Sequence, residues 1–133
     1  MSHITTLKTD IQFTQLRHVE AALLAMSKDK ELTKSGAFTY TKNTDSSQIK
    51  VRYAPIETYQ RNGNLTLNKN KEGAFEVKGD PYQCNAPMKN VISEFQKQYM
   101  YSVGKESLVK NGYTIASSGV DKAGNMVLVG RKY

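Results

Sequence analysis

Apolar and polar positions follow a helical period in two stretches of this chain. The first runs from Thr14, the expected N-cap, to about Ser27, and the second covers about residues 85–111. The first stretch carries one apolar stripe, formed by Leu16, Val19, Leu23 and Met26. The second repeats apolar positions at Met88, Val91, Ile92, Phe95, Tyr99 and Val103. We therefore predict two amphipathic helices, the second ended by Gly112.

A period of two residues predicts strands in the rest of the chain. Residues 3–11 form an alternating, threonine-rich stretch, and Phe38 and Tyr40 share one face of a short strand. The clearest alternation places Ile49, Val51 and Tyr53 on one side, and Pro55 argues against a central strand beyond Tyr53. Further strands are expected at 64–68, 74–78, 113–118 and 126–131, with 64–68 paired to 56–61 through a type I′ turn at Asn62-Gly63.

The order of these elements is strand, helix, three to five strands, helix and two strands, which predicts an α+β fold. We expect a mostly antiparallel sheet of five to seven strands, with two helices packed on one face. The 133 residues suit a single domain covering 1–133.

Composition narrows the class of protein. The only cysteine, Cys84, cannot form an internal disulfide, and no signal peptide or membrane-spanning run is present, so we expect a cytoplasmic protein. The net charge of +7 makes the chain a small basic protein, yet no run of like charges occurs. A spread of this kind favours weak contact with polyanions over a dedicated binding site.

The sequence contains no recognisable catalytic or metal-binding motif. His3, His18 and Cys84 lie far apart without paired ligand spacing, so we expect no metal, no cofactor and no catalytic residues. His18 is expected at an exposed or half-exposed helix position. Cys84 precedes a helix, where its pKa could fall, but a packed thiol is the favoured interpretation.

Basic and aromatic residues on neighbouring strands form one candidate for single-strand nucleic-acid binding. The candidate cations are Lys42, Lys50, Arg52 and Arg61, interleaved with Tyr40, Tyr53 and Tyr59. Tyr53 alternates with Arg52, however, and should point into the core. An ordinary solvated sheet face is the favoured alternative.

Two ends of the chain resemble a family of small proteins from plastids, cyanobacteria, other bacteria and phages. The matching segments are residues 1–11, the helical segment 95–101, residues 112–115 and residues 126–133, with a looser match at 75–80. The family is called hypothetical chloroplast reading frame thirty-five, or domain of unknown function twelve fifty-seven. Residues 28–63 depart from its pattern.

The resemblance implies a protein without an established enzymatic activity. It makes His3, Tyr99 and Tyr101 candidates for a shared binding site, with packing of a strand start against a helix as the alternative. It also implies an accessory role beside an AAA-type ATPase. We therefore expect a non-enzymatic protein that binds another protein; the alternative is a weak, salt-sensitive single-stranded nucleic-acid binding protein. The sequence leaves the oligomeric state open.

Overall fold

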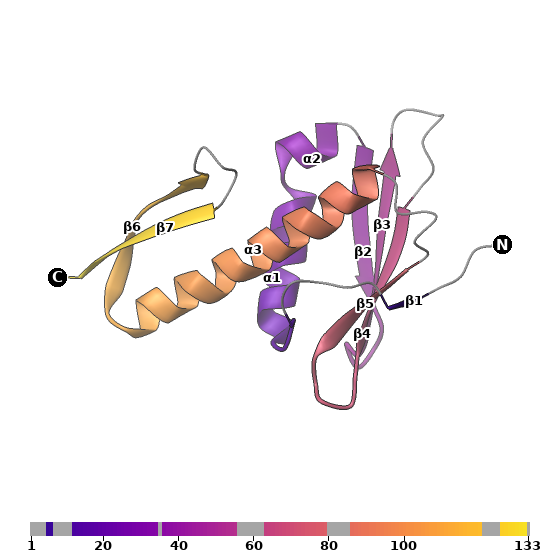
Figure 1. The fold of residues 1–133 in the computed structure, drawn as a ribbon, viewed down its shortest axis with the longest axis horizontal. Coiled ribbons are helices and arrows are strands. Elements are labelled where there is room, and N and C mark those ends of the chain that lie inside the picture. The colour runs from indigo at the N-terminus through magenta and orange to yellow at the C-terminus, as the bar shows by residue number, and fades with distance from the viewer. Residues whose placement is uncertain are drawn as a thin grey trace.

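The computed structural model describes residues 5–6, 12–34, 36–55, 63–79, 86–120 and 126–132. It has an α+β architecture, in which helices α1 and α3 pack against each other and against strands (Figure 1). The order of the predicted elements is confirmed.

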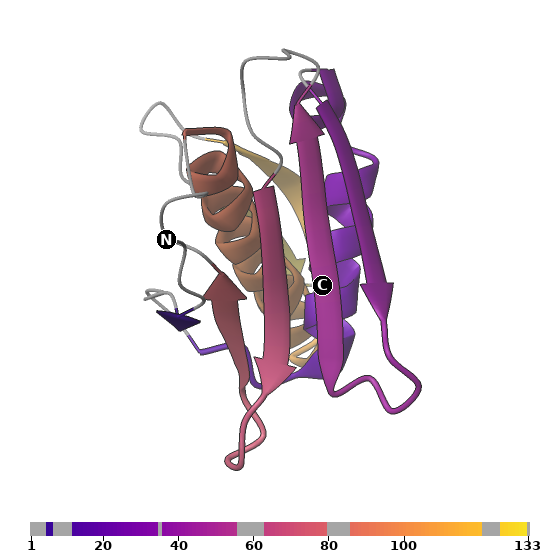
Figure 2. The ribbon, with the colours of Figure 1, turned by 90° about the vertical axis from the view of Figure 1, so that its right-hand side faces the viewer.

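The main sheet has five antiparallel strands in the spatial order β1-β5-β4-β3-β2. The strands are listed here in chain order: β1 (Thr5–Thr6), β2 (Gly36–Lys42), β3 (Gln48–Pro55), β4 (Gly63–Lys69) and β5 (Phe75–Gly79). The long strand β3 therefore lies inside the sheet, and β2 forms one border. Figure 2 shows β2 at this border with both long helices behind the sheet.

Helices α1 (Leu16–Ser27) and α3 (Ala86–Lys110) cover one face of this sheet. The predicted stripe of the first helix is confirmed, because Val19, Leu23 and Met26 are buried and Leu16 is half-buried. Helix α3 contributes Val91, Phe95 and Tyr99 to the same core, among others. A short helix that the sequence did not predict, α2 (Lys30–Lys34), packs against β2.

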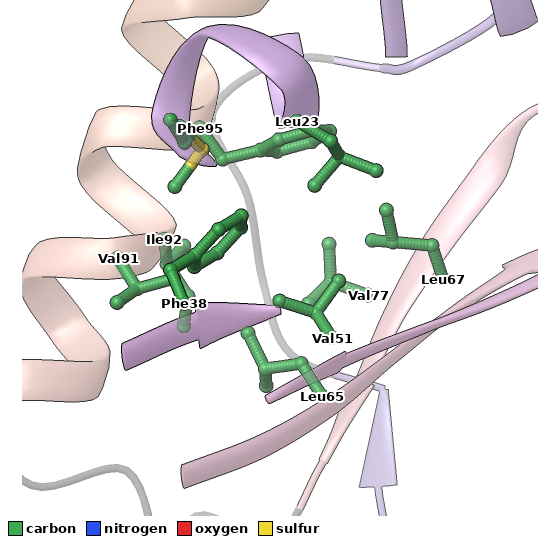
Figure 3. A pocket seen from close by; sticks show the side chains of 10 residues that line it. Leu23, Phe38, Val51, Leu65, Leu67, Val77, Val91, Ile92 and Phe95 are labelled. Atoms are coloured by element: carbon green, nitrogen blue, oxygen red, sulfur yellow. The ribbon is translucent and has the colours of Figure 1, made fainter. Parts of the chain in front are cut away.

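The core between the helices and the sheet contains a small apolar hollow. Its volume is about 20 Å³. Figure 3 shows its walls, formed by Leu23 and Met26 of α1, Val91, Ile92 and Phe95 of α3, and Phe38, Val51, Leu65, Leu67 and Val77 of the sheet. No polar side chain lines it, and an apolar hollow of this kind stays dry. It is a packing defect rather than a ligand site.

The C-terminal strands form a second sheet of their own. Strands β6 (Tyr113–Val120) and β7 (Met126–Lys132) pair as the predicted hairpin and lie beside the second half of α3 (Figure 1). Gly112 has the predicted left-handed conformation, with a φ of 84°. The hairpin approaches α3 closely because glycine stands at both contacts: a Cβ on Gly104 would lie 3.1 Å from Leu128, and one on Gly130 would lie 3.1 Å from Leu108.

Two local predictions, one of a helix cap and one of a hairpin, are wrong. The N-cap of α1 is Gln15 instead of Thr14, and it makes no side-chain capping bond. Strand β3 does continue to Pro55, but beyond Tyr53 its only described neighbour is β2, so the prediction against a central strand there is not contradicted. Strand β4 has β3 on one side and β5 on the other, so it cannot pair with residues 56–61. Residues 56–61, and most of the strand predicted at 3–11, lie outside the described residues.

Candidate interaction surfaces

A polar cluster joins α1 to α3, and its centre is His18. The sequence predicted an exposed or half-exposed histidine, whereas His18 is 4% exposed. Its Nδ1 lies 2.7 Å from the hydroxyl of Ser102, and its Nε2 lies 2.9 Å from a carboxylate oxygen of Glu106. The prediction failed because α1 buries a second stripe, which contains His18 and Ala22 and faces α3 as well as the core.

Glu106 is held by cations on both helices. Arg17 donates from Nε at 2.9 Å and from a terminal nitrogen at 2.6 Å, and Lys110 lies 3.3 Å from the same carboxylate. Hydrogen bonds from Arg17, together with Lys110 and the charge of Arg17, lower the pKa of Glu106 to about 2. The same hydrogen bonds raise the pKa of Arg17. The carboxylate is therefore ionised throughout the neutral range.

Ser102, His18 and Glu106 have the residue types of a hydrolytic triad. Acyl transfer by such a triad would also require backbone amides that are free to stabilise an oxyanion. Ser102 lies in the middle of α3, where backbone amides bond to carbonyls one turn earlier. Such amides cannot form the oxyanion hole that acyl transfer requires. Both oxygens of Glu106 are also engaged by Arg17. The geometry therefore fits a clamp between two helices.

Of the candidates taken from the family resemblance, Tyr99 and Tyr101 lie on different sides of α3. Tyr99 is 3% exposed, and its hydroxyl accepts hydrogen bonds from the amides of Thr14 at 3.0 Å and Gln15 at 3.2 Å. Tyr101 is half-buried and lies two residues further along α3, about 200° around the helix. His3 lies outside the described residues. Tyr99 therefore fastens the entry to α1.

The basic candidates divide between two faces of the main sheet. Lys50 and Arg52 are exposed on the outer face, opposite the helices. Lys42 points the other way, because its Nζ lies 2.6 Å from Glu20 of α1. Arg61 lies outside the described residues. Lys78 was not among the predicted residues, and it lies on the outer face across Thr66 from Lys50. Its alternation with the buried residues Val77 and Gly79 is the signal that indicates this position.

The outer face carries a shallow hollow above β2, β3 and β4. Its volume is about 320 Å³. The side chains that face outward there are short or cationic: Thr39, Thr41, Lys50, Arg52, Asn64 and Thr66. Tyr53 is 2% exposed on the opposite face, and Tyr40 also turns toward the helix side. The described outer face therefore offers cations and hydroxyls without an aromatic ring for base stacking.

The free border of β2 is the third surface. The amide of Asn43 donates to the carbonyl of Gln48 at 3.0 Å, and this pair continues the β2–β3 register. Since bonded and non-bonded pairs alternate in an antiparallel ladder, the odd-numbered residues of β2 bond to β3. The backbone groups of Phe38, Tyr40 and Lys42 therefore point away from the sheet. Within the described ranges no strand lies beyond them.

Comparisons with known proteins give no assignment. No protein-family model, curated protein or solved structure matches this chain. The resemblance to the plastid and cyanobacterial family therefore stays a prediction. In the part of the chain that the structure covers, no three His, Cys, Asp or Glu side chains are arranged to hold a metal ion, and no helix has the length and apolar character needed to cross a bilayer.

Proposed function

We propose that this chain is a non-enzymatic protein that binds another protein through the free edge of β2. The observation that carries the proposal is the seven-residue border strand, which has no bulge and no proline. Proteins usually protect such edges, because unpaired amides and carbonyls bind a further strand. Strand addition is a common mode of peptide recognition.

The clamp between the helices supports the non-enzymatic part of the proposal. The described imidazole, hydroxyl and carboxylate that lie within hydrogen-bonding distance are engaged with each other and with Arg17 and Lys110. Assay of Ser102→Ala for esterase activity against p-nitrophenyl acetate provides the check. We expect the wild type to equal Ser102→Ala and a no-protein blank; activity that Ser102→Ala abolishes would contradict the proposal.

The partner is tested with a matched pair of variants. Tyr40→Pro removes an amide that points to the free edge, whereas Tyr40→Ala removes the same side chain and keeps that amide. Proline is tolerated at such edge positions. The resemblance makes an AAA-type ATPase the first candidate partner. In quantitative pull-downs, we expect a genuine partner to be retained by Tyr40→Ala and lost with Tyr40→Pro.

Two results decide the outcome. Equal capture by both variants would remove β2 from the proposal, and the absence of any saturable protein partner would remove protein binding itself. If Tyr40→Pro fails to fold by circular dichroism, the pair Lys42→Pro and Lys42→Ala applies the same test at the end of β2, since both variants lose the ion pair with Glu20.

A second candidate function is weak, salt-sensitive binding of single-stranded nucleic acid on the outer sheet face. It is favoured by Lys50, Arg52 and Lys78, which form no ion pair among the described residues. Fluorescence anisotropy with an oligothymidylate should show binding that weakens with salt. Each of Lys50→Ala and Arg52→Ala should reduce the salt slope by about 0.7 if it removes one phosphate contact. No binding at low salt would dismiss this candidate.

A further inference from the structure

The surroundings of the free edge of β2 specify the chemistry of a segment that would pair with it. We infer that β2 accepts an extended peptide in which apolar and acidic residues alternate. The inference rests on the proposed function and adds the class of partner. It follows from three features: the direction of the backbone groups, the apolar residues on the helix side of the edge and the unpaired cations on the outer side.

The backbone of the added segment would form hydrogen bonds with the amides and carbonyls of the even-numbered residues of β2. Phe38, Tyr40 and Lys42 each present an amide and a carbonyl to the free edge, as the register requires. Side chains of an added strand would then alternate between the two faces of the sheet. The two sets of side chains meet different surroundings, and this difference sets the pattern of the partner.

The helix side of the edge is apolar beside Tyr40 and carries the Lys42–Glu20 ion pair at the end of β2. Tyr40 is half-buried there and packs against the core with Leu32 of α2. Glu20 reaches the end of β2 through its ion pair with Lys42, which places that stripe of α1 beside the edge. Leu24 lies one helical turn further along the same stripe and is 48% exposed. Side chains that point to this side would therefore bury apolar surface.

The outer side of the edge is cationic and open. Thr39 lies opposite Arg52, and Thr41 lies opposite Lys50, so short side chains on β2 separate the edge from two exposed cations. A strand added to β2 would lie about 10 Å from β3, which is twice the usual strand spacing. The long side chains of lysine and arginine can cover most of that distance, and the hollow of about 320 Å³ leaves room for carboxylates to meet them. Acidic side chains therefore match this face.

The test uses synthetic peptides and the isotope-labelled full chain. The probe is a nine-residue peptide that alternates valine with glutamate. The controls are a peptide that alternates valine with lysine and a block peptide with the same composition as the probe. In NMR titrations, we expect the probe to shift the amides of Phe38, Tyr40 and Lys42 and to slow their exchange with solvent. Both controls should bind at least tenfold more weakly.

Variants of the full chain separate the two faces. Lys50→Ala and Arg52→Ala should each weaken binding of the valine–glutamate probe about two- to fivefold and reduce its salt dependence, since exposed charge pairs contribute little individually. Lys105→Ala, on the exposed side of α3, is the matched control and should leave binding unchanged. Leu24→Ser should weaken binding without changing the salt dependence. Tyr40→Pro should abolish binding, whereas Tyr40→Ala should retain part of it.

Several results would overturn the inference. Equal binding of the valine–lysine peptide would remove the acidic requirement, and shifts confined to residues outside β2 would remove the edge. A dimer in light scattering that Tyr40→Pro converts to a monomer would make a second copy of the chain the occupant. An oligothymidylate that binds the outer face more tightly than the probe would assign the cations to nucleic acid. If a protein partner depends on β2 but the probe does not bind, the proposed function stands and the alternating acidic pattern is wrong.

Discussion

Replacing Tyr99 with phenylalanine gives a sharp test of whether this residue belongs to a binding site or to the scaffold. The hydroxyl of Tyr99 accepts two hydrogen bonds, from the backbone amides of Thr14 and Gln15. The substitution removes that acceptor and keeps the ring, which packs edge-on against Phe13 with centroids 5.0 Å apart. Only one oxygen atom is removed from the buried site, so the change in stability reports mainly on the hydrogen bonds.

The expected loss of stability follows from the two bonds. A hydrogen bond contributes about 0.5–1.5 kcal/mol net, and an unpaired buried donor adds to the loss. Tyr99→Phe should therefore lower the free energy of unfolding by about 1–3 kcal/mol. For a chain of 133 residues, the entropy of unfolding is about 280 cal/mol/K, so the melting temperature should fall by about 4–11 °C.

Urea denaturation and thermal melts followed by circular dichroism measure this change. Tyr101→Phe is the matched control, because the hydroxyl of Tyr101 makes no hydrogen bond with the described residues and the side chain is half-buried. It should change the stability by less than about 0.5 kcal/mol. An unchanged stability of Tyr99→Phe would refute the anchoring role, and a loss of partner binding without a loss of stability would make Tyr99 a contact residue.

Three further predictions concern stability. Gly36→Ala should destabilise the protein by about 1–3 kcal/mol in urea, because the new Cβ would lie 2.7 Å from the carbonyl oxygen of Ala54. Glu106→Gln should be less stable than the wild type above pH 4.5, and the difference should disappear as the pH falls toward 2. The reason is that the contacts that lower the pKa of Glu106 to about 2 stabilise the folded protein only while this carboxylate is ionised. A difference in stability that does not change with pH would contradict the clamp. Val77→Ile should fill the core hollow and raise stability by up to about 0.8 kcal/mol; a loss would mean that the hollow cannot accept a methyl group.

Elements with strong periodicity could be predicted from the sequence. Both long helices, the inward positions of β3 to β5 and the C-terminal hairpin follow from spacing, because burial of one face selects the period. The five-residue helix α2 was missed, as it is too short to show a period. The hairpin predicted from the Asn62-Gly63 pair is wrong for a different reason. A local turn signal predicts pairing with the adjacent segment, whereas β4 is held by non-local pairing with β3 and β5.

The candidate surfaces could be predicted only in part. Lys42 shares the parity of Phe38 and Tyr40, so its position on the helix side was available from the sequence. The partners of His18 were not available, because Ser102 and Glu106 lie 84 and more residues away and only the packing of α1 on α3 brings them together. The free edge of β2 also depends on the order of strands, which spacing along the chain does not specify.

Some described cations have a carboxylate partner and others do not. On the helix side, Arg17 and Lys110 share the single carboxylate of Glu106, and Lys42 pairs with Glu20. On the outer sheet face, the cations Lys50, Arg52 and Lys78 have no ion pair among the described residues. An anionic strand beside the free edge of β2 would therefore meet cations on the outer face that no described carboxylate neutralises. The salt dependence of binding should consequently respond to substitutions at positions 50 and 52, and hardly at all to substitution of Lys110.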